Sequence, residues 1–377
     1  HIERLNSDGT LDSTFLSTNT GADNRVRSIS LQGDGKVIIA GDFTTYNGIN
    51  RGYIARLNSD GTLDTSFLNT GAGANDLTFS TGIQSDGKIL LGGRFTSYNG
   101  TAINDIVRIN TDGSMDSTFA SGLRGIIDSV YAILIQSDGK IVLGGQFSSY
   151  NGVSRSCIVR VSSSGSLDTT FLNTGTGVSG DANARVMSLL LQSSTNYIFA
   201  TGHFTGYNGF SRGGIVGTFA NGNIYFTFEN SGVGTNNGVI LQGVAQSDGK
   251  ILIAGGFSMY NGVARGRVAR LNTDGSLDTT FLNTGVGANG TIESIAIQTD
   301  GKIIIAGDFT RYNGVSRGHI ARLNSDGSLD TTFLNTGAVA SSNYYISSVV
   351  LQSDGKVLIG GYFSTYNGTS RGNIARL

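Results

Sequence analysis

The chain repeats one segment along its whole length, and this repetition constrains the fold more than any other feature of the sequence. The tripeptide Tyr-Asn-Gly recurs at intervals of 52, 52, 57, 53, 52 and 54 residues. Its copies begin at Tyr46, Tyr98, Tyr150, Tyr207, Tyr260, Tyr312 and Tyr366. Self-similarity at a fixed period indicates a repeat architecture. We therefore predict a single domain, residues 1–377, built of seven repeats of about 53 residues.

One repeat contains the pattern of four short strands, which residues 292–333 illustrate. Residues 292–298 alternate apolar and polar side chains, and a Thr-Asp-Gly turn leads into an apolar run over 302–309. Two further strands, 319–324 and 328–333, are separated by a second Asp-Gly turn. A β-solenoid would have shorter coils, and a sandwich would not repeat its sequence. The pattern predicts an all-β fold, a seven-bladed β-propeller of four-stranded antiparallel blades.

The two ends of the chain offer one strand more than such a ring needs. Residues 2–5 and 374–377 are both copies of the third strand of a repeat. Only residues 11–15 can supply the outermost strand of the last blade, so we predict that strands from both termini close the ring. Closure removes the exposed sheet edges that invite aggregation. An open array cut from a longer one is the alternative.

Two segments carry a resemblance to a known family. The run Leu-Asn-Ser-Asp-Gly-Ser-Leu-Asp-Thr-Thr-Phe at 323–333 and the run Gln-Ser-Asp-Gly-Lys-Ile-Leu at 246–252 resemble the delta-60 repeat of bacterial and phage surface proteins. The resemblance covers essentially the whole chain. It implies a propeller fold and an extracellular location, on a cell surface or on a virion. It adds little chemistry, because this family is largely without assigned activity.

Composition excludes several kinds of partner. The net charge is −1 and no block of like charge occurs, so the chain lacks the basic surface that nucleic acid needs, and we expect no nucleic-acid partner. Apolar runs end after about five residues, far short of the roughly twenty of a membrane-spanning helix, so we expect no membrane insertion. The single cysteine, Cys157, excludes an internal disulfide.

Some repeated residues are interpreted as scaffold. Between residues 56 and 330 an arginine precedes an aspartate by eight residues in five repeats, and the fourth repeat has Gly217 and Tyr225 instead. The pairs are Arg56 and Asp64, Arg108 and Asp116, Arg160 and Asp168, Arg270 and Asp278, and Arg322 and Asp330. Their joint replacement predicts a cross-strand ion pair or shared hydrogen bonds. We interpret Tyr-Asn-Gly as a turn with an anchoring aromatic ring; the alternative is a ring of tyrosines on which sugars stack.

One position in the repeat keeps its place but changes its chemistry, and it gives the candidate ligand contacts. This is the residue before the phenylalanine that follows the second strand. The candidates are Asp42, Arg94, Gln146, His203, Asp308 and Tyr362, with Gly256 in the fifth repeat. The loops between repeats, such as 16–21, 120–125 and 229–234, vary on the same face, and function tends to lie on loops held by a rigid frame. An exposed strand end without a ligand is the alternative.

The sequence gives little support for catalysis. It has three histidines and three glutamates, and no nucleophile, zinc or phosphate-loop motif. We expect no catalytic residue, no metal and no cofactor. We predict a non-catalytic extracellular binding or adhesion module, on a cell surface or a phage tail or fibre, whose partner is a surface glycan or a protein receptor. The alternatives are a structural scaffold that contacts neighbouring subunits of an assembly, and a hydrolase or lyase using His203 with Asp181 or Asp308.

Overall fold

The chain forms β-strands and turns throughout the part that the structure describes. The computed structural model describes residues 2–15, 21–68, 72–119, 129–172, 175–228, 234–235, 238–282, 285–333, 345–363, 365–366 and 369–370. Within these ranges no residue lies in a helix, and so this part of the chain contains no membrane-spanning helix. The all-β class predicted from the sequence is confirmed.

A three-stranded antiparallel sheet is the repeating unit. The first consists of β2 (Val26–Leu31), β3 (Val37–Gly41) and β6 (Ile54–Leu57), in this order. The corresponding sheets are β7 (Thr78–Ile83), β8 (Ile89–Gly93) and β11 (Ile106–Ile109); β12 (Ser129–Ile135), β13 (Ile141–Gln146) and β16 (Ile158–Val161); β18 (Arg185–Gln192), β19 (Tyr197–His203) and β22 (Ile215–Thr218); β23 (Ile240–Ala245), β24 (Ile251–Gly255) and β27 (Val268–Leu271); β28 (Ile292–Ile297), β29 (Ile303–Gly307) and β32 (Ile320–Leu323); and β33 (Tyr345–Leu351), β34 (Val357–Tyr362) and β1 (Ile2–Leu5).

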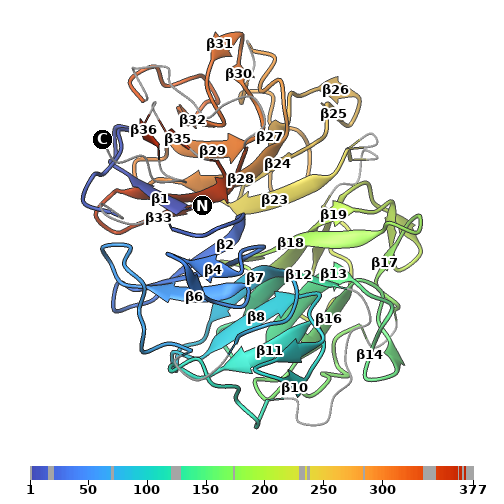
Figure 1. The fold of residues 1–377 in the computed structure, drawn as a ribbon. Helices are drawn as coiled ribbons and strands as arrows, with labels where there is room; N and C mark the ends of the chain where they lie inside the picture. Colours follow the sequence, from blue (N-terminus) through green and yellow to red (C-terminus); the bar gives the residue numbers. More distant parts are fainter. Residues whose placement is uncertain are drawn as a thin grey trace.

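The first strand of each sheet lies toward the middle of the molecule (Figure 1). We call these the inner strands; they are β2, β7, β12, β18, β23, β28 and β33. Each contacts the inner strand of the next sheet, and β33 contacts β2. Of the second strands, β3, β8, β24 and β29 are buried along their full length because sheets cover both of their faces, which explains their continuous apolar sequence.

The predicted fourth strand is much shorter than expected. In the first repeat it is reduced to a single antiparallel bridge between Leu57 and Leu63. The Asp64 carboxylate then accepts hydrogen bonds from the backbone N–H and the hydroxyl of Ser66, two residues on. Aspartate commonly stabilises a turn in this way, so the chain turns where the sequence pattern predicted a strand. The prediction of four full strands per blade is corrected to three strands and one bridge.

A small hairpin follows the second strand of each repeat. In the first it consists of β4 (Thr45–Tyr46) and β5 (Ile49–Asn50). Asn47 and Gly48, at its tip, have φ of 51° and 76°, which a type I′ turn requires and which asparagine and glycine tolerate best. The others are β9 (Ser97–Tyr98) with β10 (Thr101–Ala102), β14 (Ser149–Tyr150) with β15 (Val153–Ser154), β20 (Gly206–Tyr207) with β21 (Phe210–Ser211) and the added β17 (Val178–Ser179), β25 (Met259–Tyr260) with β26 (Val263–Ala264), β30 (Arg311–Tyr312) with β31 (Val315–Ser316), and β35 (Thr365–Tyr366) with β36 (Thr369–Ser370).

The repeated tyrosines anchor these hairpins from inside the core. Tyr46 is fully buried, and its hydroxyl donates a hydrogen bond of 2.7 Å to the carbonyl oxygen of Gly61 in the turn after the third strand. The equivalent hydrogen bond is present in each of the six other repeats, at 2.7–2.8 Å. The interpretation of Tyr-Asn-Gly as a turn with an anchoring ring is confirmed. The alternative, a surface of stacking tyrosines, is wrong, because these rings are buried.

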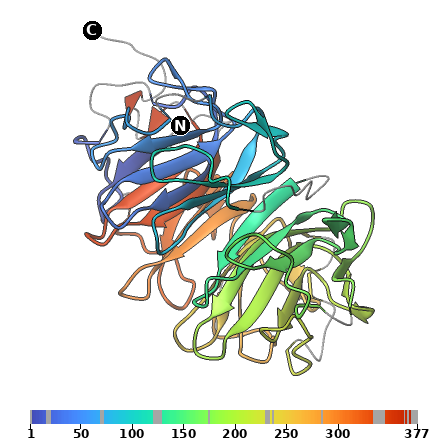
Figure 2. The same ribbon diagram turned by 90° about the horizontal axis from the view of Figure 1, so that it is seen from below.

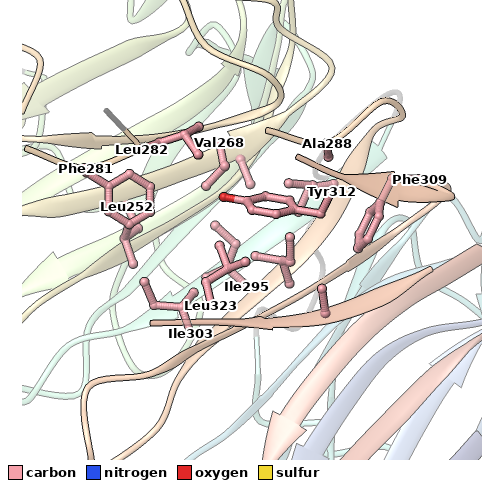
Figure 3. Close-up of a cluster of buried hydrophobic side chains, with 14 residues drawn as sticks. Leu252, Val268, Phe281, Leu282, Ala288, Ile295, Ile303, Phe309, Tyr312 and Leu323 are labelled. Carbon is pink, nitrogen blue, oxygen red and sulfur yellow. The ribbon is translucent and has the colours of Figure 1, made fainter. Parts of the chain in front are cut away.

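The hydrophobic core lies between neighbouring sheets. Figure 3 shows one cluster, in which Leu252 and Val268 of one sheet pack against Ile303, Tyr312 and Leu323 of the next repeat. Equivalent clusters join each pair of consecutive sheets, and one joins Ile2 and Leu358 of the last sheet to residues of the first. A single repeat therefore buries its apolar side chains only when a neighbour covers them.

The two ends of the chain meet in one sheet. β1 pairs with β34, with Ile2 opposite Gly360, so the N-terminal strand takes the third place in the last sheet. In Figure 2 the blue N-terminal strands lie beside the red strands from the other end. The Arg4 Nη1 also donates to the carbonyl oxygen of Ser59 in the first repeat, at 2.7 Å. The competing copy at 374–377 lies outside the described residues.

The predicted arginine–aspartate pairs are confirmed, and each has further members. Arg56 Nε donates to Asp64 Oδ2 at 2.7 Å, and Lys36 Nζ donates to the same oxygen, also at 2.7 Å. Arg56 Nη1 donates across to the carbonyl oxygen of Thr111 in the next repeat, and the guanidinium lies over the Phe67 ring. We call this Lys-Arg-Asp group the clamp. It joins three strand segments of one repeat and ties them to the next.

The fourth repeat replaces the clamp as a set. Tyr197, Gly217 and Tyr225 stand where the other repeats have lysine, arginine and aspartate. Phe199 lies opposite Gly217 in the sheet, and a Cβ at Gly217 would lie 2.8 Å from the Phe199 ring. The ring centroids of Tyr197 and Tyr225 are 4.5 Å apart. Aromatic packing therefore substitutes here for the ionic network, which explains why its members change together.

The clamp makes stability depend on pH. Burial by itself would raise the pKa of the Asp64 carboxyl, but hydrogen bonds from Lys36, Ser66 and Arg56 outweigh it and hold this pKa well below its usual range. The aspartates of the other clamps behave alike. Asp168 is shifted less, and its pKa is lowered to about 2, since Lys140 Nζ lies 3.4 Å away and gives no hydrogen bond.

We predict that the free energy of unfolding is lost in acid. Below about pH 4 the aspartates of the unfolded chain bind protons while those of the folded chain stay ionised, so stability falls with pH until the folded carboxyls titrate near and below pH 2. Urea denaturation at a series of pH values measures this. The Asp64→Asn variant should show a shallower fall than the parent chain. Equal stability at pH 5 and pH 2.5 would contradict the prediction.

Candidate ligand-binding site

Every inner strand contains a β-bulge at the same place. In β2 the pairing with β3 passes from Val26 to Ser28, so Arg27 is left out of the ladder. The residues at this position, which we call the bulge residues, are Arg27, Phe79, Tyr131, Met187, Leu241, Glu293 and Ser347. A bulge redirects a side chain, and bulges are frequent beside functional sites. Each bulge residue lies near the start of its strand, on the side of the small hairpins.

A glycine opposite each bulge makes it possible. A Cβ at Gly41 would lie 2.2 Å from the carbonyl oxygen of Arg25, so only glycine allows the two backbones to approach this closely. The same close approach, at 2.0–2.4 Å, recurs at Gly93, Gly145, Gly202, Gly255, Gly307 and Gly361. The repeated glycine at the end of the second strand is thus explained by the bulge on the strand beside it.

The bulge residues surround one pocket in the centre of the molecule. Its volume is about 290 Å³, and residues from all the inner strands line it. All bulge residues are part of this lining, and all are half-buried. The next residue along each strand, most often a serine such as Ser28, Ser80 or Ser294, also lines the wall. We call this the mouth pocket.

The mouth pocket has an apolar half and a polar half. Four consecutive sheets contribute Phe79, Tyr131, Met187 and Leu241, and the ring centroids of Phe79 and Tyr131 are 4.9 Å apart. The remaining sheets contribute Glu293, Ser347 and Arg27. A small number of placed polar groups opposite an apolar wall is typical of small-ligand sites.

Two ion pairs organise the polar half. Arg25 donates to Glu293 Oε2 and to Ser347 Oγ, both at 2.7 Å, and so joins three sheets. Arg27 donates from Nε and Nη2 to the two oxygens of Asp42, the second bond being 2.8 Å long. The two guanidinium groups also lie over aromatic rings, Arg25 over Tyr345 at 4.5 Å and Arg27 over Phe79 at 5.2 Å.

Glu293 is the most perturbed acid of the pocket. Burial raises the pKa of its carboxyl, the positive charges of Arg25 and Arg27 oppose this rise, and the nearby carboxylate of Asp308 adds to it.

A hydrogen bond between sheets also fixes the pocket wall: Gln242 Oε1 accepts a hydrogen bond of 2.6 Å from the backbone N–H of Ile295 in the next sheet. The polar half is therefore held in place before any ligand arrives.

Two of the candidate residues predicted from the sequence reach the mouth pocket through a partner. Asp42 binds Arg27, and Asp308 influences Glu293 electrostatically. Both follow the glycine at the end of a second strand, and neither is among the residues that line the pocket.

The other candidate residues are not among the lining residues of the mouth pocket, although Gln146 and His203 contact the same segment, 181–183. Arg94 Nε is 3.2 Å from Asp76 Oδ2, and both side chains are largely exposed. Gln146 Nε2 lies 3.3 Å from the carbonyl oxygen of Ala182. His203 Nδ1 lies 3.3 Å from the carbonyl oxygen of Asn183 and 3.7 Å from Asp181 Oδ1, and the ring centroids of Tyr362 and Tyr345 are 6.2 Å apart. Most of the variable loops, 16–20, 120–128 and 229–233, lie outside the described residues.

Sequence reasoning missed the bulge residues, although the signal was available. They too keep one place in the repeat and change in chemistry, between an apolar residue such as Val26 and a small one such as Ser28. An alternating strand pattern gives no warning that one residue is extra. Among the described residues, no group of three or more His, Cys, Asp or Glu side chains is placed to hold a metal ion.

Comparison with known proteins shows the class of fold. The structure is similar to the WD40 β-propeller domain of Doa1, with 17% identity, 93% of each chain covered and a TM-score of 0.58. It is also similar to a streptogramin B lyase, with 13% identity, 96% of this chain and 97% of the other covered, and a TM-score of 0.51. At these identities the likeness shows the fold alone: the chain is a β-propeller protein.

The family follows from the sequence itself. The model of a family described as a domain of unknown function (DUF5122) β-propeller matches residues 1–15, 32–67, 84–119, 136–171, 246–281, 298–333 and 352–377, more than half of the chain. The chain belongs to this family. The matches omit the fourth repeat, which lacks the clamp. No curated protein matches the sequence.

We predict that the glycine opposite a bulge cannot be replaced. Gly255→Ala places a Cβ 2.0 Å from the carbonyl oxygen of Val239 and should cost about 2 kcal/mol or more of unfolding free energy. Its neighbour provides the control, because a Cβ at Gly256 meets no atom closer than Thr291 Oγ1 at 4.0 Å. Gly256→Ala should change stability by less than about 0.5 kcal/mol in urea denaturation. Equal effects of the two substitutions would show that the close approach is unimportant.

Proposed function

We propose that the repeated sheets are the blades of a closed seven-bladed propeller, and that β1 completes the last blade. The pairing of β1 with β34 and the contact of β33 with β2 support closure. The apolar cluster that joins Ile2 and Leu358 to the first sheet supports it as well. A closed ring leaves only the short outer edge of each blade exposed.

Arg4 tests this closure, because it links the last blade to the first. If β1 holds its place in solution, Arg4→Ala should lower the free energy of unfolding by about 3 kcal/mol, as breaking a buried pair does, and by about as much as the matched substitution Arg56→Ala. Urea denaturation compares the two. A loss confined to Arg56→Ala would mean that the ring is open at β1.

We propose that the protein is a non-catalytic binding module that recognises a surface glycan or a protein receptor outside the cell. One observation carries this proposal: a bulge in every inner strand presents a different side chain to one central pocket. A frame that repeats while its pocket residues vary is the arrangement expected when a scaffold holds a specific site. The ionisable side chains of the pocket are held in ion pairs, Arg25 with Glu293 and Arg27 with Asp42, which favours binding over proton transfer.

The extracellular location rests on sequence properties. Only 14% of the residues are charged, and the segments 246–252 and 323–333 resemble delta-60 repeats of bacterial and phage surface proteins. A cell surface or a phage tail or fibre is the location that we propose. Presentation in several copies would strengthen binding that is weak at each site.

Binding of the labelled protein to a glycan array and to intact bacterial cells, in calcium and in chelator, tests the binding function. Leu241→Arg places a long charged side chain in the apolar half of the mouth pocket and should reduce binding at least about tenfold. Val263→Arg is the matched control, because Val263 is exposed on a small hairpin and is not among the lining residues. It should leave binding within about twofold.

The other outcomes separate the alternatives. Binding that survives Leu241→Arg would place the site outside the mouth pocket. No binding under any condition would favour the scaffold alternative, in which the chain contacts neighbouring subunits of a larger assembly.

A further inference from the structure

We infer that the mouth pocket takes a single uncharged sugar ring, which stacks on Tyr131 and hydrogen-bonds across the pocket to Arg27 and Glu293. This inference rests on the proposed binding function and names the chemistry of its ligand. The arguments are the charge balance of the pocket, its unused hydrogen-bonding groups, its aromatic wall and its size.

Both arginines of the polar half are already paired with a carboxylate, and this pairing disfavours an ionic ligand of either sign. The two guanidinium groups of Arg25 and Arg27 lie within electrostatic reach of three carboxylates, those of Glu293, Asp42 and Asp308. An anionic ligand would be repelled by the carboxylates, whose arginine partners are already engaged. A cationic ligand would be repelled by the two arginines. Like charges in a half-buried site repel strongly, because the surrounding protein screens them less than water does.

Paired charges still offer hydrogen bonds to a neutral ligand. Arg27 uses Nε and Nη2 and keeps an Nη1 that bonds to no other described residue. Glu293 uses Oε2 and keeps Oε1. Hydrogen bonds with one ionised partner are the strong ones. A donor and an acceptor on the same side of a pocket suit neighbouring hydroxyl groups, each of which can donate and accept.

The aromatic wall supplies the opposite surface. Arg27 covers the Phe79 ring, and the Tyr131 ring lies beside Phe79 at 4.9 Å with 40° between the ring planes. Tyr131 is half-buried and lines the pocket. The face of an aromatic ring is negative, so it attracts the weakly positive C–H groups on one side of a sugar ring. Met187 and Leu241 continue this apolar wall.

The size of the pocket limits the ligand to one ring. A volume of about 290 Å³ lies at the lower end of the range for small-ligand sites, so a longer glycan would extend out of the mouth. Serine hydroxyls line the wall beside the bulge residues and provide further polar contacts.

An array of neutral glycans and of sialylated and sulfated glycans, probed with the whole chain, tests the inference. We expect neutral glycans to bind, Tyr131→Ala to weaken this binding at least about tenfold and Tyr131→Phe to weaken it less than about threefold. Phe226→Ala is the control, because Phe226 is 53% exposed and packs on Phe210 away from the pocket. It should have no effect. Circular dichroism of each variant shows whether it is folded.

Salt and charge provide the second readout. Binding of a neutral sugar should change less than about twofold between about 50 and 500 mM salt, whereas binding of an ionic ligand is screened. Glu293→Gln keeps the shape of the side chain and one hydrogen-bond acceptor. It should therefore weaken the binding of neutral glycans less than the binding of a cationic ligand, which would lose its counter-charge.

The outcomes distinguish this inference from the function on which it rests. Binding confined to sialylated or sulfated glycans, and lost in Tyr131→Ala, would overturn the uncharged ligand and leave the pocket in place. Binding of neutral glycans that Tyr131→Ala leaves intact would overturn the pocket assignment. Cells that bind the protein through a non-glycan receptor would overturn the sugar and keep the binding module. Failure to bind both glycans and cells would overturn both proposals.

Discussion

The structure depends on packing between neighbouring sheets, since no repeat can bury its apolar side chains alone. Each cluster of buried residues takes members from two consecutive sheets, as Leu252 and Ile303 show in Figure 3. Burial of these side chains is the main source of stability. The clamp orients neighbouring sheets relative to each other, because Arg56 is held by Asp64 in its own repeat and donates a hydrogen bond to a backbone carbonyl of the next repeat. Each sheet thus finds its position from the one before it, and the same contacts carry the last sheet to the first.

The bulges separate the frame from the candidate site. One glycine and one extra residue per repeat suffice to turn a side chain from the sheet into the mouth pocket, and no bulge residue belongs to the buried clusters between sheets. The side chain at the bulge is therefore free to vary: Phe79, Tyr131 and Glu293 occupy equivalent places. Arg25 and Arg27 then connect these independent positions into one polar half with two ion pairs.

The fourth repeat shows that the clamp acts as a unit. A lone loss of Arg or Asp would leave a buried charge without its partner, which costs several kcal/mol, whereas replacement of the whole group by Tyr197, Gly217 and Tyr225 removes every charge at once. Phe199 fills the space that the arginine occupies elsewhere. Coupled residues of this kind change together because their contributions are not additive.

The β-strands, the turns and the scaffold role of the repeated residues could be predicted from the amino-acid sequence. These depend on local periodicity, on Asn-Gly and Asp-Gly turns, and on the joint replacement at Gly217 and Tyr225, all of which are visible in one dimension. The sequence overestimated the fourth strand, because the hydrogen bonds of Asp64 to Ser66 favour a turn over a ladder. The fold was needed to show that Phe79, Tyr131 and Glu293 share a pocket while Arg94, Gln146 and His203 do not line it. A bulge is a mismatch between two strands, so it exists only once the strands are paired.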